Sequence, residues 1–220
     1  MRLTSRNDEP VCPKHHAVQR WVGRLLGGVR HEQQVAAIAS SLFDLTLPLH
    51  GLPLADRRLL RLAAMVHDVG RCVSKPEHPT EGAWLVMSDT TLPLSQTERR
   101  ELAYLTCYHR DAIPPPGSDA ILHPGDDHDR LLRVLALLRS ADALDSRSLE
   151  PSRLVFALLG PANARSGGRT LLRATCYVEN DCPKTRRVYA RRKKFRLLED
   201  LLGVRVEVDV ARAEALRLVA

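Results

Sequence analysis

Aromatic residues and long apolar runs are both scarce in this sequence. Phe, Trp and Tyr make up 4% of the 220 residues, so little aromatic surface is available for base stacking, and a nucleic-acid partner is only weakly supported. No apolar run approaches the ~18 residues that a membrane-spanning helix needs. The N-terminal stretch MRLTSRNDEPVCPK lacks the apolar core of a secretory signal. We therefore expect a cytoplasmic protein without a membrane partner.

Cysteine is present, but not in a pattern that binds zinc or forms a disulfide framework. The number of cysteines is odd, they are scattered along the chain, and no two of them form a C-x-x-C motif. This usage is typical of reduced thiols in a cytoplasmic protein. The five residues are Cys12, Cys72, Cys107, Cys176 and Cys182.

Histidine is absent and basic residues are dense towards the C-terminus. Residues 1–150 hold 18 basic and 19 acidic residues, whereas residues 151–220 hold 15 and 7. All nine histidines lie at or before His128. We expect this asymmetry to mark a domain boundary. The expected division is a flexible tail over residues 1–13, a helical domain over residues 14–150 and a small basic subdomain over residues 151–220.

Apolar spacing predicts that the first 150 residues are almost entirely helical. Between Ala17 and Leu47 the apolar residues recur every three or four positions, and Gly27-Gly28 interrupts them, which predicts two helices with His31 near the start of the second. Asp56 is interpreted as the N-cap of a third helix that ends at Gly70. Further helices are predicted from Pro79 to Met87, from the Ser95-x-x-Glu98 capping box to His109, and from Arg130 onwards after a loop over residues 114–127.

The pattern changes after Pro151. The segments RLVFALL, RTLLRATCYV and VRVEVDV are rich in β-branched residues and predict three strands. Between the last two, Lys184 to Leu202 is interpreted as one basic helix that Gly203 ends. The predicted fold is therefore mainly α, with a helical core and a small C-terminal α/β appendage.

His67 and Asp68 stand side by side at the end of an apolar helix, in the stretch AAMVHDVGR. Adjacent helix residues point about 100° apart, so the two side chains cannot share one outward stripe. Either the pair forms a buried structural hydrogen bond, or both side chains converge on something that other residues also reach.

Four further ionisable residues sit on or beside the predicted core helices. We predict that His31, His67, Asp68 and Asp142 bind one divalent metal ion, and that Asp68 bridges to a second ion held by His78 and His109. Imidazole and carboxylate ligands suit Mn, Fe, Zn, Co or Mg. Any one of these histidines alone would more often be a structural polar group. The remaining histidines, expected in solvent, are His15, His16, His50, His123 and His128.

Several segments follow one another as they do in a known family. These segments are HEQQVAAIA, SLFDL, LLRLAAMVHDVGR, ELAYLTCYHR, LLRVLALLRSADALDSR and RRKKFRLLEDLLGVRVEV. They resemble the HD-domain superfamily of metal-dependent phosphohydrolases and, more narrowly, the C-terminal region of the exopolyphosphatase/guanosine pentaphosphate phosphatase (Ppx/GppA) family. The resemblance covers roughly residues 17–210.

Two departures from that family limit what the resemblance implies. Full-length members carry an actin-like domain with the polyphosphate-hydrolysing site, and nothing in this sequence corresponds to it, so exopolyphosphatase activity is not carried over. In that family the segment after the His-Asp pair often reads His-His-x-His. Here it reads His78-Pro79-Thr80-Glu81, with glutamate in place of the last histidine.

The segment KTRRVYARRKKFR carries eight positive charges in thirteen residues. It is interpreted either as a solvated basic helix or as a binding track for a polyanion such as polyphosphate, a nucleotide or RNA. The predicted track consists of Lys184, Arg186, Arg187, Arg191, Arg192, Lys193 and Lys194.

Three functions are compatible with these features. The first is a metal-dependent phosphohydrolase acting on a phosphate-rich metabolite, namely a nucleotide, an alarmone or polyphosphate. In it Asp68 holds the metals that activate water, and Arg71 or Arg110 stabilises the phosphoryl oxygens. The second is a non-catalytic module that binds polyphosphate or a nucleotide. The third is a di-iron oxygenase. Each of these three functions is compatible with a protein that forms homo-oligomers.

Overall fold

The structure is a computed structural model that describes residues 13–110, 112–147, 153–160, 168–190 and 192–214. It is mainly helical with a small C-terminal sheet, which confirms the predicted fold class. The predicted tail, residues 1–13, lies outside the described residues except for Pro13. The helical part comprises α1 (Pro13–Leu26), α2 (Arg30–His50), α3 (Leu54–Val66), the short 3₁₀ helix η1 (Val69–Cys72), α4 (His78–Ser88), α5 (Gln96–Cys107) and α6 (His128–Ala143).

The break between α1 and α2 is where the two glycines predicted it. Gly27 adopts a left-handed backbone with φ of 74°, which ends α1, and α2 begins at Arg30. The prediction that His50 lies in solvent was wrong, because its side chain is buried at the end of α2. Its Nε2 donates to the carbonyl of Phe43 at 3.0 Å, and its Nδ1 accepts from the Leu52 amide at 2.9 Å. His50 is therefore a structural residue that joins α2 to the following turn.

Asp56 is not the N-cap of α3, as the sequence pattern had predicted. The helix begins at Leu54 and Pro53 occupies the cap position. Asp56 is instead buried in the first turn and forms an ion pair with Arg130 at the start of α6. The capping-box prediction was correct. The Glu98 amide donates to the Ser95 hydroxyl, and the Ser95 amide donates to the Glu98 carboxylate.

Gly70 does not end α3, which stops at Val66, but it lets two segments approach closely. A Cβ atom at Gly70 would lie 2.2 Å from the His78 carbonyl oxygen and 2.4 Å from the Gly82 amide nitrogen. Such distances exclude any side chain, so η1 packs directly on the backbone of α4. This contact fixes the start of α4, and with it His78, beside the residues that follow α3.

The C-terminal part is a three-stranded sheet with strands β1 (Arg153–Leu159), β2 (Thr170–Val178) and β3 (Val204–Arg212) in that order. Strands β1 and β2 are antiparallel, as expected for a hairpin, whereas β2 and β3 are parallel. A parallel pair needs a crossover connection. That connection contains α7 (Pro183–Tyr189), the 3₁₀ helix η3 (Arg192–Phe195) and α8 (Arg196–Leu202).

The prediction of one basic helix from Lys184 to Leu202 was wrong. The segment forms two helices and a 3₁₀ turn, with α7 packed on β3 and α8 packed on both β3 and α6. The break lets both Tyr189 and Phe195 be buried, so tertiary packing overrides the local helix preference. The end at Gly203 was predicted correctly, because this residue is left-handed with φ of 64°.

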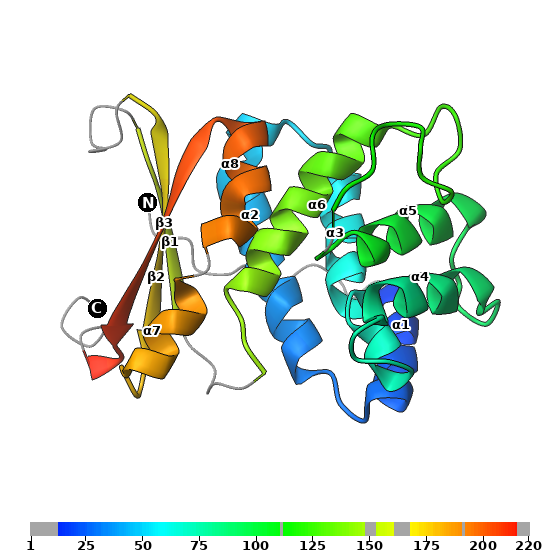
Figure 1. Cartoon of the computed structure of the whole chain (residues 1–220), viewed down its shortest axis with the longest axis horizontal. Helices are drawn as coiled ribbons and strands as arrows, with labels where there is room; N and C mark the ends of the chain where they lie inside the picture. The colour runs from blue at the N-terminus through cyan, green and yellow to red at the C-terminus, as the bar shows by residue number, and fades with distance from the viewer. Residues whose placement is uncertain (1–12, 111, 148–152, 161–167, 191, 215–220) are drawn as a thin grey trace.

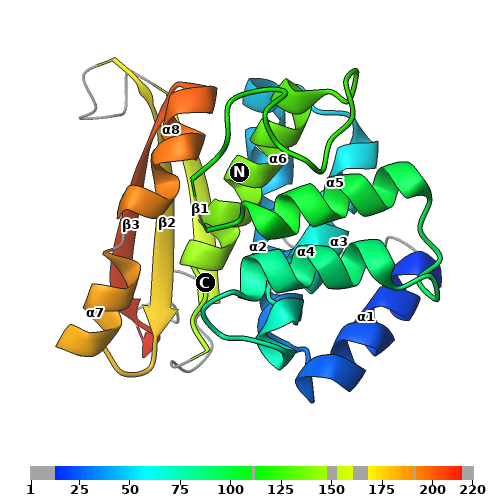
Figure 2. The ribbon, with the colours of Figure 1, turned by 45° about the vertical axis from the view of Figure 1, so that its right-hand side comes forward.

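The sheet lies at one end of the molecule, and α1, α4 and α5 lie at the other (Figure 1). Helices α7 and α8 lie on the side of the sheet facing the helical part, and α4 and α5 run alongside one another (Figures 1 and 2). One cluster of buried apolar side chains continues from Val18 to Val206, so the appendage is docked through a shared core. Among the described residues, no helix is long and apolar enough to cross a membrane.

Candidate metal centre

His67 and Asp68 both point into one site because α3 ends between Val66 and His67. His67 still has helical backbone angles (φ −53°, ψ −35°), whereas Asp68 has left the helix (φ −102°, ψ 4°). This change of backbone direction turns two adjacent side chains towards the same space. Both are buried, His67 completely and Asp68 to all but 6%.

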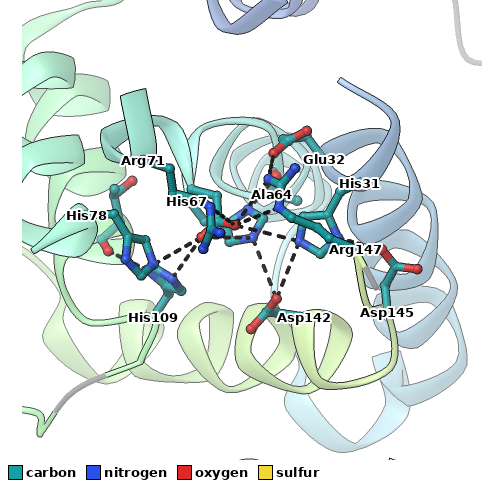
Figure 3. Close-up of polar contacts among 12 residues, drawn as sticks. His31, Glu32, Ala64, His67, Arg71, His78, His109, Asp142, Asp145 and Arg147 are labelled. Atoms are coloured by element: carbon teal, nitrogen blue, oxygen red, sulfur yellow. Dashed lines mark hydrogen bonds and ion pairs between the residues drawn. The ribbon is translucent and has the colours of Figure 1, made fainter. Parts of the chain in front are cut away.

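The six residues predicted as metal ligands lie together, although they come from five places in the chain (Figure 3). His31 stands in the first turn of α2, His78 begins α4, His109 follows α5, and Asp142 is near the end of α6. Their ligand atoms form two groups, and within each group all of these atoms lie within 4.8 Å of one another. The first group is His31, His67 and Asp142, and the second is Asp68, His78 and His109.

Asp68 belongs to the second group and also faces the first. Its Oδ1 is 3.1 Å from His78 Nε2 and 3.7 Å from His109 Nε2. Its Oδ2 is 3.9 Å from His31 Nε2. On the other side of the first group, Asp142 Oδ1 lies 3.6 Å from His31 Nε2 and 3.7 Å from His67 Nε2. Asp68 thus occupies the position of a carboxylate that could bridge two cations.

Each of the four histidines is anchored through Nδ1. The Nδ1 atoms of His67, His78 and His109 lie 2.6 to 2.8 Å from the backbone carbonyl three residues earlier. A carbonyl oxygen only accepts, so Nδ1 carries the proton, and a neutral ring then presents the lone pair of Nε2. His31 Nδ1 lies 2.5 Å from Asp145 Oδ2. Such second contacts are typical of histidines that bind metal, because they fix the ring and its tautomer.

Three of the Nε2 atoms lack any hydrogen-bond partner within the described part of the chain. They belong to His67, His78 and His109, and all three are buried. A buried polar atom without a partner costs roughly 1–3 kcal/mol, so three of them around one carboxylate need an explanation. Nitrogen and carboxylate donors at this spacing match the ligands of a divalent cation. The residues present therefore fit a metal.

Charges at the site are strongly coupled. Burial alone would raise the pKa of Asp68, but the neighbouring His109 and His78 imidazoles outweigh this effect and hold that pKa far below its usual range. Burial would lower the pKa of His31, but contacts with Asp142 and Asp145 raise it to about 9. Without a cation, His31 is therefore protonated at neutral pH, and a metal has to displace that proton.

Sequence reasoning missed three residues that complete this centre: Glu32, Asp145 and Arg147. Arg147 donates to Asp68 Oδ2 from Nε at 3.2 Å and from Nη2 at 3.1 Å, and it also pairs with the fully buried Glu32. Asp145 and Arg147 lie three and five residues beyond Asp142, so their place just after a ligand-bearing helix was the available signal. For Glu32 the signal was weaker: it is an acidic residue next to His31, a proposed ligand.

Three other basic residues differ in how closely they approach the proposed ligands. Arg71 Nε is 3.7 Å from Asp68 Oδ2, and its side chain is 29% exposed, which places it at the rim. Arg110 is exposed and directly follows His109. Lys194, predicted as part of a polyanion track, extends from η3 to the site, and its Nζ donates to Asp142 Oδ2 at 2.8 Å.

The other described side chains of the predicted polyanion track lie on the outside of the appendage. Lys184, Arg187 and Lys193 are exposed, and Arg186 pairs with Asp181 at 2.6 Å. Arg191 and the side chain of Arg192 are outside the described residues. The basic residues therefore divide into Lys194 at the site and an exposed set away from it.

Comparison with known families gives a match over more than half of the chain. Residues 21–156 match the model of the Ppx/GppA phosphatase family, domain III. The chain belongs to this family. The matched region of this Ppx/GppA domain contains all six clustered residues as well as Glu32, Asp145 and Arg147. No curated protein matches the chain.

Proposed function

We propose that this Ppx/GppA domain is a metal-dependent phosphohydrolase of the HD superfamily, acting on a phosphate-rich metabolite. One observation carries the proposal. The buried Nε2 atoms of His67, His78 and His109 surround Asp68 without hydrogen-bond partners among the described residues. A cluster kept only for structure would pair these atoms or replace them with apolar groups, since unpaired buried polar atoms destabilise the fold.

The proposed ligands divide as the two groups do. His31, His67, Asp68 and Asp142 would hold one ion, and Asp68, His78 and His109 the second. A donor set with four imidazoles favours Mn, Fe, Zn or Co over Mg, which prefers oxygen ligands. Bound divalent ions would polarise the phosphoryl oxygens and lower the pKa of a water molecule.

The chain's own residues contribute orientation and charge. Asp145 fixes the ring of His31, and the backbone carbonyls of Ala64, Lys75 and Thr106 fix the other three histidines. Arg71 and Arg147 both lie against Asp68 and are partly exposed, so their guanidinium groups are placed to bind the oxygens of an incoming phosphate. Arg147 thus joins Arg71 as a proposed catalytic residue. Arg110 is the more distant candidate.

Metal content and activity test the proposal together. We expect protein purified without chelator to contain one or two equivalents of a transition metal and to release phosphate from phosphorylated substrates. Asp68→Asn should lose both while keeping its helical circular dichroism. The matched control is Asp44→Asn on α2, which breaks an exposed ion pair with Arg57 on α3. A folded wild-type protein that binds none of Mn, Fe, Zn or Co would contradict the proposal.

The alternative is a binding module without catalysis, and the exposed basic residues of the appendage favour it. In that case polyphosphate would bind to Lys184, Arg187 and Lys193, with an affinity that falls steeply with salt. The triple change of these residues to glutamate would abolish such binding, whereas Asp68→Asn would leave it intact. For the hydrolase we expect the reverse: Asp68→Asn abolishes phosphate release, and the triple change leaves it intact.

A further inference from the structure

A pocket of about 290 Å³ opens beside the metal centre, between the turn that links α1 to α2 and the end of α6. It shares His31, Asp145 and Arg147 with the centre, so anything bound in it lies next to the proposed ligands. Its other walls include the backbone at Gly28 and the side chains of Arg30 and Gln34.

The charges around the pocket suit an anionic group at its inner end. Arg147 donates from Nε and Nη2 to Glu32 and Asp68, so within the described part of the chain the two Nη1 donors of its five remain for a ligand. Arg30 adds a second, exposed guanidinium at the wall. The carboxylate of Asp145 is held by His31 at 2.5 Å, and this pairing offsets its repulsion of an anion.

The size and the remaining wall suit a small organic group. Pockets for small molecules usually span ~300–1,000 Å³, so this one holds about one sugar or nucleoside and not a polymer segment. The amide of Gln34 both donates and accepts, which matches hydroxyl groups or a base edge. A linear polyphosphate, in contrast, has neither sugar hydroxyl groups nor a base edge to pair with the Gln34 amide.

We propose that this pocket binds the organic part of a small phosphomonoester, of the size of a sugar phosphate or a nucleoside monophosphate. Its phosphate group lies at Arg147, next to Asp68. The inference rests on the proposed function and narrows its substrate from phosphate-rich metabolites in general to small monoesters. In the reaction, the oxygen of water forms a bond to phosphorus, the ester P–O bond breaks, and the alcohol leaves with a proton as inorganic phosphate is released.

Gly28 allows the pocket to be filled without disturbing the fold. Its φ is not in the left-handed region, and a Cβ atom there would meet nothing within 4 Å. We expect Gly28→Trp to raise the Kd and KM for adenosine 5′-monophosphate at least tenfold, with unchanged metal content and melting temperature. Gln34→Leu should weaken the same binding. The matched control is Gly160→Trp, where the same two conditions hold at a loop after β1.

Binding by calorimetry and phosphate release are measured separately on the metal-loaded protein. If the protein binds the nucleotide but hydrolyses nothing, and Gly28→Trp abolishes that binding, the pocket assignment stands and the proposed function fails. If hydrolysis occurs at equal KM in wild type and Gly28→Trp, the pocket assignment is overturned and the function stands. Faster hydrolysis of long-chain polyphosphate than of adenosine 5′-monophosphate or glucose 6-phosphate overturns it too, as does the absence of binding of both monoesters.

Discussion

At the scale of single residues, the centre depends on what holds each imidazole from behind. Three rings are held by backbone carbonyls, which no substitution removes, whereas His31 is held by the side chain of Asp145. Asp145 is therefore the one described anchor of these four rings that a single side-chain change can delete. Removing the Asp145 side chain therefore measures how much the orientation of the His31 ring contributes to metal binding, while all the proposed ligands remain.

We expect Asp145→Ala to weaken metal binding by about 10- to 100-fold, the usual effect of losing such a supporting group. The ligand His31 remains, but its ring loses the acceptor that fixes Nδ1. A competition titration with a chromophoric chelator measures the change. Asp129→Ala, at an exposed position on the first turn of α6, serves as the control. Equal affinity in both variants would show that Asp145 has no orienting role.

The six proposed ligand residues could be singled out from sequence because each is an ionisable group on or beside an apolar helix, where it needs a reason to be buried, and the structure brings them together. His67 and Asp68 are the clearest case. Glu32 and Arg147 could not be predicted as a pair, since they are 115 residues apart and their contact depends on how α2 and α6 pack. The burial of His50 was also not predicted, because it depends on a hydrogen bond to the Phe43 carbonyl that forms only when the end of α2 is folded.

At the scale of elements, the contact between η1 and α4 positions half of the centre. Gly70 and Gly82 meet with almost no space between their backbones. Asp68 lies two residues before Gly70, and the carbonyl of His78 is part of the contact, so the close approach at Gly70 sets the separation of Asp68 and His78. The sequence showed Gly70, but only as a helix terminator, because the approach of a distant segment leaves no local pattern.

Gly70→Ala should therefore be strongly destabilising. The added methyl group would overlap the His78 carbonyl oxygen at 2.2 Å, and backbone atoms cannot yield as side chains do. We expect a loss of about 3 kcal/mol or more in the free energy of unfolding, at or beyond the upper end of ordinary overpacking. Urea denaturation measures it. Gly160→Ala, which meets nothing within 4 Å, should change stability by less than about 1 kcal/mol.

At the scale of the whole molecule, the appendage and the helical part share a core and an ion pair. Lys194 belongs to the crossover of the sheet, yet it contacts Asp142 on α6. Charge asymmetry along the sequence indicated two regions with different properties, but not that a lysine of one region reaches the proposed metal site of the other. The break between α7 and α8, which the helical pattern had hidden, places η3 against α6.

Lys194→Met should lower stability in the metal-free protein by roughly 1–2 kcal/mol, because it leaves a nearly buried carboxylate without its ammonium partner. The loss should be smaller when the protein is saturated with Mn²⁺, since the cation then balances the charge of Asp142. Denaturation with and without Mn²⁺ measures both values. The neighbouring Lys193→Met, at an exposed position, is the control. The same loss in both metal states would refute this link between the appendage and the centre.

The contacts that complete the centre join residues that are distant along the chain. Asp145 is 114 positions from His31, and Arg147 is 115 positions from Glu32. Closing such long loops is entropically costly and slow compared with forming the helices themselves. During synthesis on the ribosome, His31, His67, His78 and His109 emerge first and form an incomplete set of ligands. Only after residues 142–147 have left the exit tunnel can the centre close, so we expect a nascent or truncated chain to lack the metal site proposed for the finished protein.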